Sequence, residues 1–284
     1  MSRLEIDNLW VRFPTRNGIF DAVRGVSFSL DGERLGIVGE SGSGKSMTGR
    51  AILRLIRKLG QVSANHISLD GRDLLKLSER EMRRVRGQQI SMIMQDPKFS
   101  LNPVMTVGEQ MMESYMLQVK GPRNRARDKV IEMLDAVAIR DPDRVFNAYP
   151  HELSGGMGQR VMIAMMLIPD PDILIADEPT SALDVSVQMQ VLNILDRLVR
   201  DRGMGLIFIS HDLNLVSSFC DRVLIMYAGR IVEACAADKL HEATHPYTQG
   251  LLRSLPRLDA PQDRLQVLDR DPAWAEAESV SGIK

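Results

Sequence analysis

Two segments of the chain carry residue types that bind phosphate. The first, at 39–46, reads GESGSGKS and fits the pattern G-x-x-x-x-G-K-[ST], in which backbone amides surround the phosphate oxygens of a nucleotide. Lys45 is expected to contact the β- and γ-phosphates, and Ser46 to bind Mg²⁺. The predicted cradle consists of Gly39, Glu40, Ser41, Gly42, Ser43, Gly44, Lys45, Ser46 and, one residue further, Met47.

The second segment starts at His151 and reads HELSGGMGQRVMIAMM. Ser154 can cap the helix that the following apolar run predicts. Gly155 and Gly156 let backbone N–H groups approach an anion at the positive end of that helix. The chain therefore has two candidate phosphate sites that lie far apart in the sequence.

Polar side chains also follow three apolar segments that look like buried strands. Asp177 and Glu178 come at the end of ILIADEP, where Asp177 can hold Mg²⁺ directly or through water and Glu178 can orient and deprotonate an attacking water. His211 follows GLIFIS and is expected to face the γ-phosphate, and Gln95 follows ISMIM, from where it can reach the metal or the water. Taken alone, the two acids also fit a solvated turn before a proline, and a lone histidine is more often a packed or surface residue.

The first of the elements that must position these residues is a pair of alternating segments near the N-terminus. RLEIDNLWVRF and AVRGVSFSL alternate apolar and polar residues on either side of the turn Asn17-Gly18, which predicts an antiparallel sheet. RLGIVG is continuously apolar and predicts a buried parallel strand that leads into the first glycine loop. KSMTGRAILRLIRKL, at 45–59, predicts the helix that follows.

Helical periodicity dominates from Met105 to Ala148, in two segments separated by Gly121-Pro122. We interpret this stretch as a helical lobe inserted into an α/β core. DILIA and GLIFIS then resume the parallel sheet, and DRVLIMYAGRIVEAC predicts a hairpin that turns at Ala228-Gly229. The predicted fold is α/β: a P-loop NTPase core with a mostly parallel sheet, an N-terminal antiparallel β subdomain and an inserted helical subdomain.

Composition excludes several other classes of protein. A chain of 284 residues with 44% hydrophobic content can bury a large core, and its formal charge of −1 gives no indication of nucleic-acid binding. The cysteines, Cys220 and Cys235, are too few for a disulfide framework and are expected to be small buried or half-buried residues. The charged first ten residues contain no secretory signal, and the longest apolar run, at 161–168, is too short to span a membrane.

Taken in order, the motifs resemble those of the nucleotide-binding subunits of ATP-binding cassette (ABC) transporters. They are GESGSGKS, Gln95, LSGG, ILIADEP, SALD and His211. QDPKFSLNPVMTVGEQ and HPYTQGLLRSLP are similar to the oligopeptide/dipeptide (and nickel) importer branch of this family. No cysteine follows Cys235, so the iron–sulfur cysteine cluster of some members of the branch is excluded.

The resemblance explains the second glycine segment. In this family two subunits pair head to tail, so Ser154, Gly155 and Gly156 would contact the γ-phosphate of ATP held by the partner. Asp184, in SALD, would line the dimer interface. Phe13 lies where the family has an aromatic ring under adenine, although it also fits a core position of the N-terminal sheet, and Phe20 is the next candidate. Gly158 stands where this branch usually has arginine.

The function implied by the resemblance is ATP hydrolysis that energises import of a small solute, with oligopeptides or dipeptides as the expected class. The catalytic residues would be Glu178, His211, Gln95 and Lys45, and the cofactors ATP and Mg²⁺, with Ser46, Gln95 and Asp177 at the metal. The chain would be a peripheral protein on the cytoplasmic side of the membrane. Its partners would be integral membrane permeases, a second ABC ATPase that is a different chain or a second copy, and indirectly a solute-binding protein, with no nucleic acid.

Three further expectations remain. The alternative function is a non-transport ABC ATPase that acts as a nucleic-acid clamp. We place the ATPase domain at 1–258, with its helical subdomain at about 96–153, and a C-terminal tail at 259–284 that is loosely attached or partly disordered. The methionine-rich stretches within 105–117 and 157–166 fit core packing better than partner docking, and both uses stay open.

Overall fold

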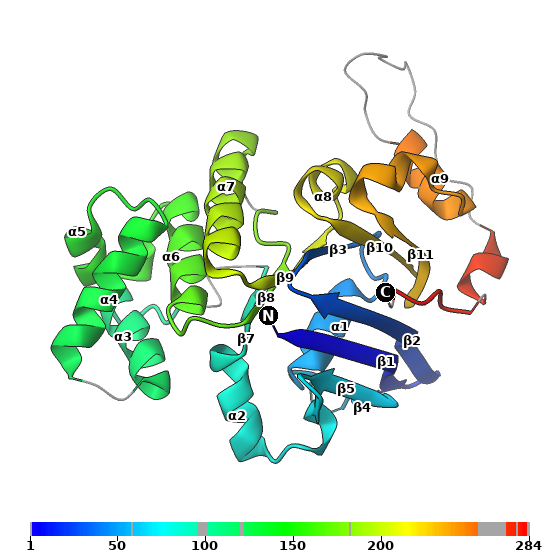
Figure 1. Ribbon diagram of the computed structural model, residues 1–284, viewed down its shortest axis with the longest axis horizontal. Helices are drawn as coiled ribbons and strands as arrows, with labels where there is room; N and C mark the ends of the chain where they lie inside the picture. The colour runs from blue at the N-terminus through cyan, green and yellow to red at the C-terminus, as the bar shows by residue number, and fades with distance from the viewer. Residues whose placement is uncertain are drawn as a thin grey trace. The chain divides into compact units, whose positions relative to one another are not determined.

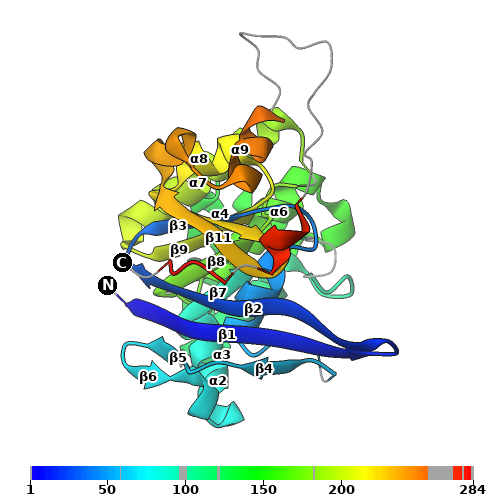
Figure 2. The ribbon, with the colours of Figure 1, turned by 90° about the vertical axis from the view of Figure 1, so that its right-hand side faces the viewer.

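The computed structural model describes residues 2–57, 59–95, 101–119, 122–181, 183–254, 271–276 and 278–282. They fall into two compact units, shown in Figures 1 and 2. Leu77–Leu206 forms the inserted unit, and Ser2–Lys76 together with Ile207–Lys284 forms the discontinuous unit.

An antiparallel sheet opens the discontinuous unit, as the alternating segments predict. β1 and β2 pair along their whole length, from Arg3 opposite Asp31 to Thr15 opposite Gly18, and the turn lies between Thr15 and Gly18. The alternate residues Leu4 and Ile6 of β1 are buried, which explains the period of two. The sheet contains β1 (Arg3–Thr15), β2 (Gly18–Asp31), β4 (Gln61–Ser63), β5 (His66–Leu69) and β6 (Arg72–Asp73).

The same unit holds a second group of strands with helices around it. The apolar strand β3 (Arg34–Val38) pairs in parallel with β10 (Arg222–Tyr227), which forms the predicted hairpin with β11 (Arg230–Ala236). Helix α8 (Leu213–Phe219) packs so tightly on β3 that a Cβ on Gly36 would lie 2.2 Å from Val216. The helices of this unit are α1 (Lys45–Ile52), η1 (Leu74–Lys76), α8 (Leu213–Phe219), η4 (Ala237–Glu242), α9 (Pro246–Arg253) and η5 (Pro272–Ala275).

Helix α1 is shorter than its sequence predicts. The apolar period continues to residue 59, but the helix ends at Ile52. Arg54 has φ of 53°, a left-handed conformation that interrupts the helical hydrogen-bond ladder. The helical preference of the local sequence is therefore overridden by the left-handed backbone conformation of Arg54.

The inserted unit contains the predicted helical stretch. Thr106 and Glu109 form a capping box at the start of α3 (Val107–Gln118), and Asp141 caps α5 (Pro142–Asn147). β7 and β8 pair in parallel, and β9 (Gly205–Ser210) begins in this unit. The other elements are α2 (Glu79–Gln88), β7 (Ile90–Ile93), α3 (Val107–Gln118), α4 (Arg123–Ala136), α5 (Pro142–Asn147), η3 (Pro150–Glu152), α6 (Gly155–Leu167), β8 (Ile173–Asp177) and α7 (Val185–Arg202). The subdomain limits at 96 and 153 stay a prediction.

The expectation of a loosely attached tail is wrong for residues 271–276 and 278–282. The Ala275 carbonyl accepts hydrogen bonds from Arg24 (2.9 Å) and Arg230 (3.2 Å). The Val280 amide donates to the Ile231 carbonyl at 2.7 Å, and Gly282 bridges to β2 at Phe28. The sequence signal was misleading because these contacts use backbone groups and need little apolar periodicity. The rest of the predicted tail, at 259–270, 277, 283 and 284, lies outside the described residues.

Two further expectations concern the cysteines and the membrane. Cys220 is buried and Cys235 half-buried, as predicted, and burial raises the pKa of both thiols. Across the parts of the chain that the structure describes, each helix is too short or too polar to cross a bilayer.

Candidate functional site

The first glycine loop joins β3 to α1 and requires glycine at its last turn. Gly44 has φ of 101°, and a Cβ there would lie 2.5 Å from the Ala22 carbonyl oxygen. Gly42 also has a left-handed backbone, with φ of 83°. The loop therefore curls back over the start of α1, where the amides of a helix N-terminus attract an anion.

Lys45 lies at the base of this loop and is only 5% exposed. Its Nζ donates hydrogen bonds to the carbonyl oxygens of Gly39 (2.7 Å) and Glu40 (2.9 Å). The ammonium group is thus placed by the loop that is predicted to bind the phosphates. Ser46 is half-buried on the first turn of α1, next to Met47.

The tip of the β10–β11 hairpin contacts the first glycine loop through a backbone hydrogen bond. Sequence reasoning missed this contact. The Gly229 amide donates to the Ser43 carbonyl at 3.0 Å, and the Gly229 carbonyl accepts from the Arg24 amide at 2.7 Å. Gly229 has φ of 84°, which its place in the turn requires. The sequence signal available was the Ala228-Gly229 turn itself, but nothing local indicates what it touches.

His211 follows β9, as predicted, and belongs to the same unit as the phosphate loop. It lines a hollow of about 470 Å³ together with Gly39, Glu40, Ser41 and Leu251. The structure therefore brings the histidine and the start of the phosphate loop to one hollow. A ligand bound in it would meet an imidazole on one side and the loop on the other.

In the inserted unit, Gln95 and Glu178 come together. Gln95 Nε2 donates to Glu178 Oε2 at 2.9 Å. Glu178 directly follows β8 and has φ of 47°, an uncommon conformation for a residue with a side chain. Asp177, the last residue of β8, is 1% exposed. Both carboxylates stand at the carboxyl end of this buried strand, where ligands lie in open α/β sheets.

A second restraint acts on the segment that follows Glu178. The side chain of Gln159, on α6, is 2% exposed and its Nε2 donates to the Pro179 carbonyl oxygen. Helix α6 is therefore tied to the residue immediately after Glu178. Sequence reasoning missed Gln159 because a polar residue among methionines looks like a helix-surface position.

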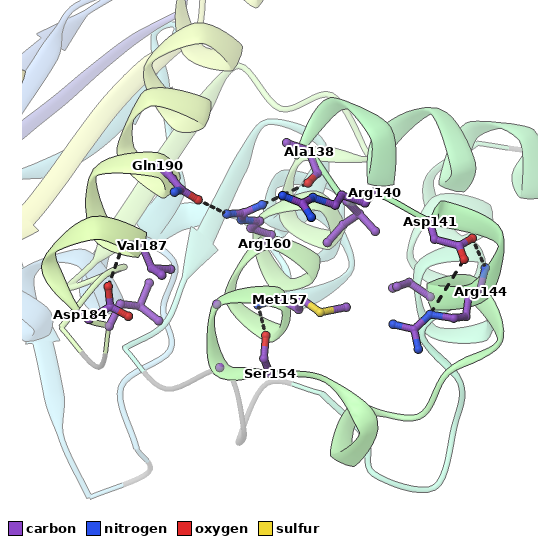
Figure 3. A pocket seen from close by; sticks show the side chains of 15 residues that line it. Ala138, Arg140, Asp141, Arg144, Ser154, Met157, Arg160, Asp184, Val187 and Gln190 are labelled. Atoms are coloured by element: carbon purple, nitrogen blue, oxygen red, sulfur yellow. Dashed lines mark hydrogen bonds and ion pairs between the residues drawn. The ribbon is translucent and has the colours of Figure 1, made fainter.

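The second glycine segment caps α6 as predicted, and its start opens onto a hollow of about 600 Å³ (Figure 3). Ser154 Oγ accepts a hydrogen bond from the Met157 amide at 3.4 Å. Asp184 caps α7 on the same hollow, and hydrogen bonds from the Val187 amide and then the Ser186 hydroxyl lower the pKa of its carboxyl group. The residues that line the hollow include Ser154, Gly155, Gly156, Asp184, Arg140, Arg144 and Arg160.

The arginines of this hollow differ in how they are held. Arg160 donates to the Ala138 carbonyl at 3.1 Å and to Gln190 at 2.7 Å, which fixes its guanidinium between the segment that follows α4 and helix α7 (Figure 3). The Arg144 side chain forms one long ion pair of 4.0 Å with Asp141 and no other among the described residues. Positive charge and the amide end of α6 thus line one surface, a combination that suits an anionic ligand.

Phe13 is half-buried near the end of β1, opposite Phe20, which is 56% exposed. The Phe13 ring lies against Gly60, where a Cβ would come within 2.7 Å of it. Part of the ring therefore serves the packing of this unit, and its place under adenine stays a prediction, as does that of Phe20.

Replacing Gly158 with alanine should stabilise the protein. Gly158 lies inside α6, its φ is not positive, and an added Cβ would meet no atom within 4 Å among the described residues. Alanine loses less backbone entropy than glycine on folding, so the free energy of unfolding should rise by about 0.4–1 kcal/mol. Urea denaturation measures the change, and Gly156→Ala, whose Cβ would lie 2.7 Å from Val187, should lack this gain. A loss of stability in Gly158→Ala would contradict the expectation.

A glycine loop between a buried strand and a helix, with its lysine at the base, defines a P-loop nucleotide-binding protein. The family model described as "ABC transporter" matches residues 23–181, and "Oligopeptide/dipeptide transporter, C-terminal region" matches residues 232–282. The chain belongs to the ABC transporter family. Its fold is the ABC cassette, with an antiparallel N-terminal β subdomain, a mostly parallel sheet and helical content, as the sequence predicts.

Curated relatives and solved structures agree with this assignment. The chain is 45% identical to the oligopeptide transport ATP-binding protein OppD of Haemophilus influenzae, over 95% of this chain and 84% of that protein. It is 47% identical to the dipeptide transport ATP-binding protein DppD of Bacillus subtilis, over 95% and 81%. The dimeric bacterial ABC transporter cassette MJ0796 superposes with a TM-score of 0.74 at 26% identity, over 82% of this chain and 98% of that one.

Proposed function

We propose that this chain is the ATP-hydrolysing subunit of an importer for oligopeptides or dipeptides. It works as a peripheral protein on the cytoplasmic side of the membrane, beside separate integral membrane permeases. The observation that carries the ATP-binding part is the buried lysine at the base of a glycine loop. The match of residues 232–282 to the oligopeptide/dipeptide transporter model supports the solute class.

The residues divide the chemistry of ATP hydrolysis between them. Lys45 and the loop amides hold the triphosphate, and His211 stabilises charge on it. Glu178 removes a proton from the attacking water, and Gln95 orients the Glu178 carboxylate through the hydrogen bond described above. Mg²⁺ prefers hard oxygen donors. The proposed ligands supply such donors: the hydroxyl of Ser46, the buried carboxylate of Asp177 and the amide oxygen of Gln95. When bound, the metal would neutralise negative charge on the phosphates.

The second hollow serves a second nucleotide. One triphosphate needs one cradle, and the start of α6 presents Ser154, Gly155 and Gly156 on a hollow lined by arginines. We propose that this hollow receives the ATP bound by a partner ATPase, with Asp184 at the subunit interface. The partner is a different ATPase chain rather than a second copy, and a solute-binding protein delivers the peptide to the permeases.

A methionine-lined hollow on α3 is the proposed contact for the permease. It has a volume of about 460 Å³ and carries apolar side chains flanked by both signs of charge. Met116 is 40% exposed and Leu117 76% exposed, although Met111 of the same helix is fully buried. Methionine adapts to irregular apolar partners, so this helix combines core packing on one face with docking on the other.

Replacing Lys45 with alanine tests the proposed function. The substitution removes a charge-assisted hydrogen bond to the phosphates, so ATP affinity should fall by about 10- to 150-fold. Titration of the purified protein with a fluorescent ATP analogue measures the affinity. Uptake of a labelled dipeptide by cells that express the permeases should be lost in parallel.

Lys76→Ala is the matched control, because the Lys76 side chain is 84% exposed and forms an ion pair of 3.2 Å with Asp73. It should leave both ATP affinity and uptake unchanged. Unchanged ATP affinity in Lys45→Ala would refute the nucleotide site. Intact peptide uptake in that variant, or a chain that co-purifies with no membrane permease, would refute the transport role.

A further inference from the structure

Tyr247 connects the C-terminal region to the phosphate loop. Its side chain is completely buried at the start of α9, and its hydroxyl oxygen accepts a hydrogen bond from the Glu40 amide at 3.2 Å. Glu40 is the second residue of the glycine loop, whereas Tyr247 lies within the segment matched by the oligopeptide/dipeptide C-terminal model. Both residues belong to the discontinuous unit.

The peptide bond between Gly39 and Glu40 is held at both ends. Its N–H donates to Tyr247, and its carbonyl oxygen, on Gly39, accepts from Lys45 Nζ at 2.7 Å. The peptide unit is planar, so fixing the direction of the N–H also fixes the direction of the carbonyl. Tyr247 therefore sets the orientation of an acceptor that positions the Lys45 ammonium.

The Tyr247 ring is in turn contacted by aromatic side chains, and its backbone amide by His245. Its centroid lies 4.5 Å from that of Tyr227 and 6.3 Å from that of Trp274, in the C-terminal η5. η5 lies beside α9 in both views (Figures 1 and 2). His245 Nδ1 accepts from the Tyr247 amide at 3.2 Å, which requires a neutral imidazole, and burial lowers the pKa of His245 accordingly.

We propose that Tyr247 is a positioning residue for the nucleotide, and that Trp274 of the C-terminal segment holds it in place. It orients the Gly39–Glu40 peptide and, through it, the Lys45 ammonium that meets the triphosphate. The inference rests on the proposed ATP site. It gives the C-terminal segment a part in ATP binding, in addition to any contact that segment makes with other subunits.

The first test compares two tyrosines of the same cluster. Tyr247→Phe removes the hydroxyl and keeps the ring, so the KM for ATP should rise by about 2- to 10-fold, the size expected for one neutral hydrogen bond, while kcat at saturating ATP changes less than about 2-fold. Tyr227→Phe is the matched control, because among the described residues its hydroxyl forms no hydrogen bond. It should leave KM, kcat and the melting temperature unchanged.

The second test asks whether the effect passes through Lys45. In a Lys45→Ala background, Tyr247→Phe should cause no further loss of ATP affinity, because the group that it positions is gone. If Tyr247 had a purely structural role, Tyr247→Phe would weaken ATP binding equally in the wild-type and Lys45→Ala backgrounds. Trp274→Leu should weaken ATP binding in the wild-type chain and add little in the Tyr247→Phe chain.

The outcomes separate the inference from the proposed function. If the wild-type chain binds ATP and Tyr247→Phe binds it equally well, the inference is overturned and the nucleotide site stands. Equal losses in Tyr227→Phe and Tyr247→Phe, or additive effects of Tyr247→Phe and Lys45→Ala, also overturn it. If the wild-type chain binds no ATP, the proposed function fails and the inference falls with it.

Discussion

A chain carrying Glu178→Gln should bind ATP as tightly as the wild type and hydrolyse it about 10²–10⁴ times more slowly, the usual contribution of a positioned general base. The glutamine amide has the size of the carboxylate and can still accept the hydrogen bond from Gln95, now 2.9 Å from Glu178 Oε2. The glutamine amide cannot, however, accept a proton from the attacking water. Single-turnover phosphate release measures the rate, and a fluorescent nucleotide measures the affinity.

The matched control for this variant is Glu132→Gln, on α4, which removes an exposed carboxylate paired with Lys129. It should turn over ATP at the wild-type rate. Hydrolysis by Glu178→Gln at that same rate would remove Glu178 as the base. A parallel loss of ATP affinity would instead show that the substitution disturbs the end of β8.

Replacing Arg222 with leucine should lower the free energy of unfolding by about 3–5 kcal/mol, the cost of leaving one member of a buried ion pair alone. Arg222 and Glu33 are 2.8 Å apart, with side chains 10% and 9% exposed. The guanidinium also donates to the carbonyl oxygens of Ser29 and Gly282, so the substitution frees the C-terminal segment as well. Urea denaturation followed by circular dichroism measures the loss.

Two control variants test the cause of this loss of stability. The double variant Arg222→Leu/Glu33→Leu buries no charge and should recover much of the stability, because hydrophobic pairs often replace buried ion pairs at little cost. Arg3→Leu breaks the exposed pair with Glu5 and should cost no more than about 1 kcal/mol. An Arg222→Leu chain that unfolds at the same urea concentration as Arg3→Leu would contradict the assignment of Arg222 as a structural anchor.

The sequence predicts those elements whose signal is local. The strands β1 and β2 follow from alternation around a hairpin turn, and β3 from an apolar run before the glycine loop. Ser154 is predicted as a helix cap because its residue type and the run that follows it are adjacent in the chain. The proximity of Gln95 and Glu178 could be expected because both residues follow the carboxyl ends of strands that pair in parallel.

Contacts between distant segments could not be predicted in this way. Tyr247 and Glu40 are separated by 207 positions, and the tyrosine lies in a short helix with an ordinary apolar pattern. The C-terminal segment was misjudged because it is held by carbonyls and amides, which every sequence possesses. The early end of α1 depends on the backbone of Arg54, a residue whose intrinsic preference is helical.

The division of one unit between the two ends of the chain also determines when the nucleotide site matures during protein synthesis. The phosphate loop is made early, whereas Gly229, Tyr247 and Trp274, which support it, emerge last. About 200 residues separate Lys45 from Tyr247, so at ~5–20 residues per second the ribosome needs about 10–40 s to supply the anchor. Over that time the whole of the inserted unit, which is continuous in sequence, is synthesised. A prematurely terminated chain would carry the complete glycine motif without its supports, so nucleotide binding would distinguish finished subunits from unfinished ones.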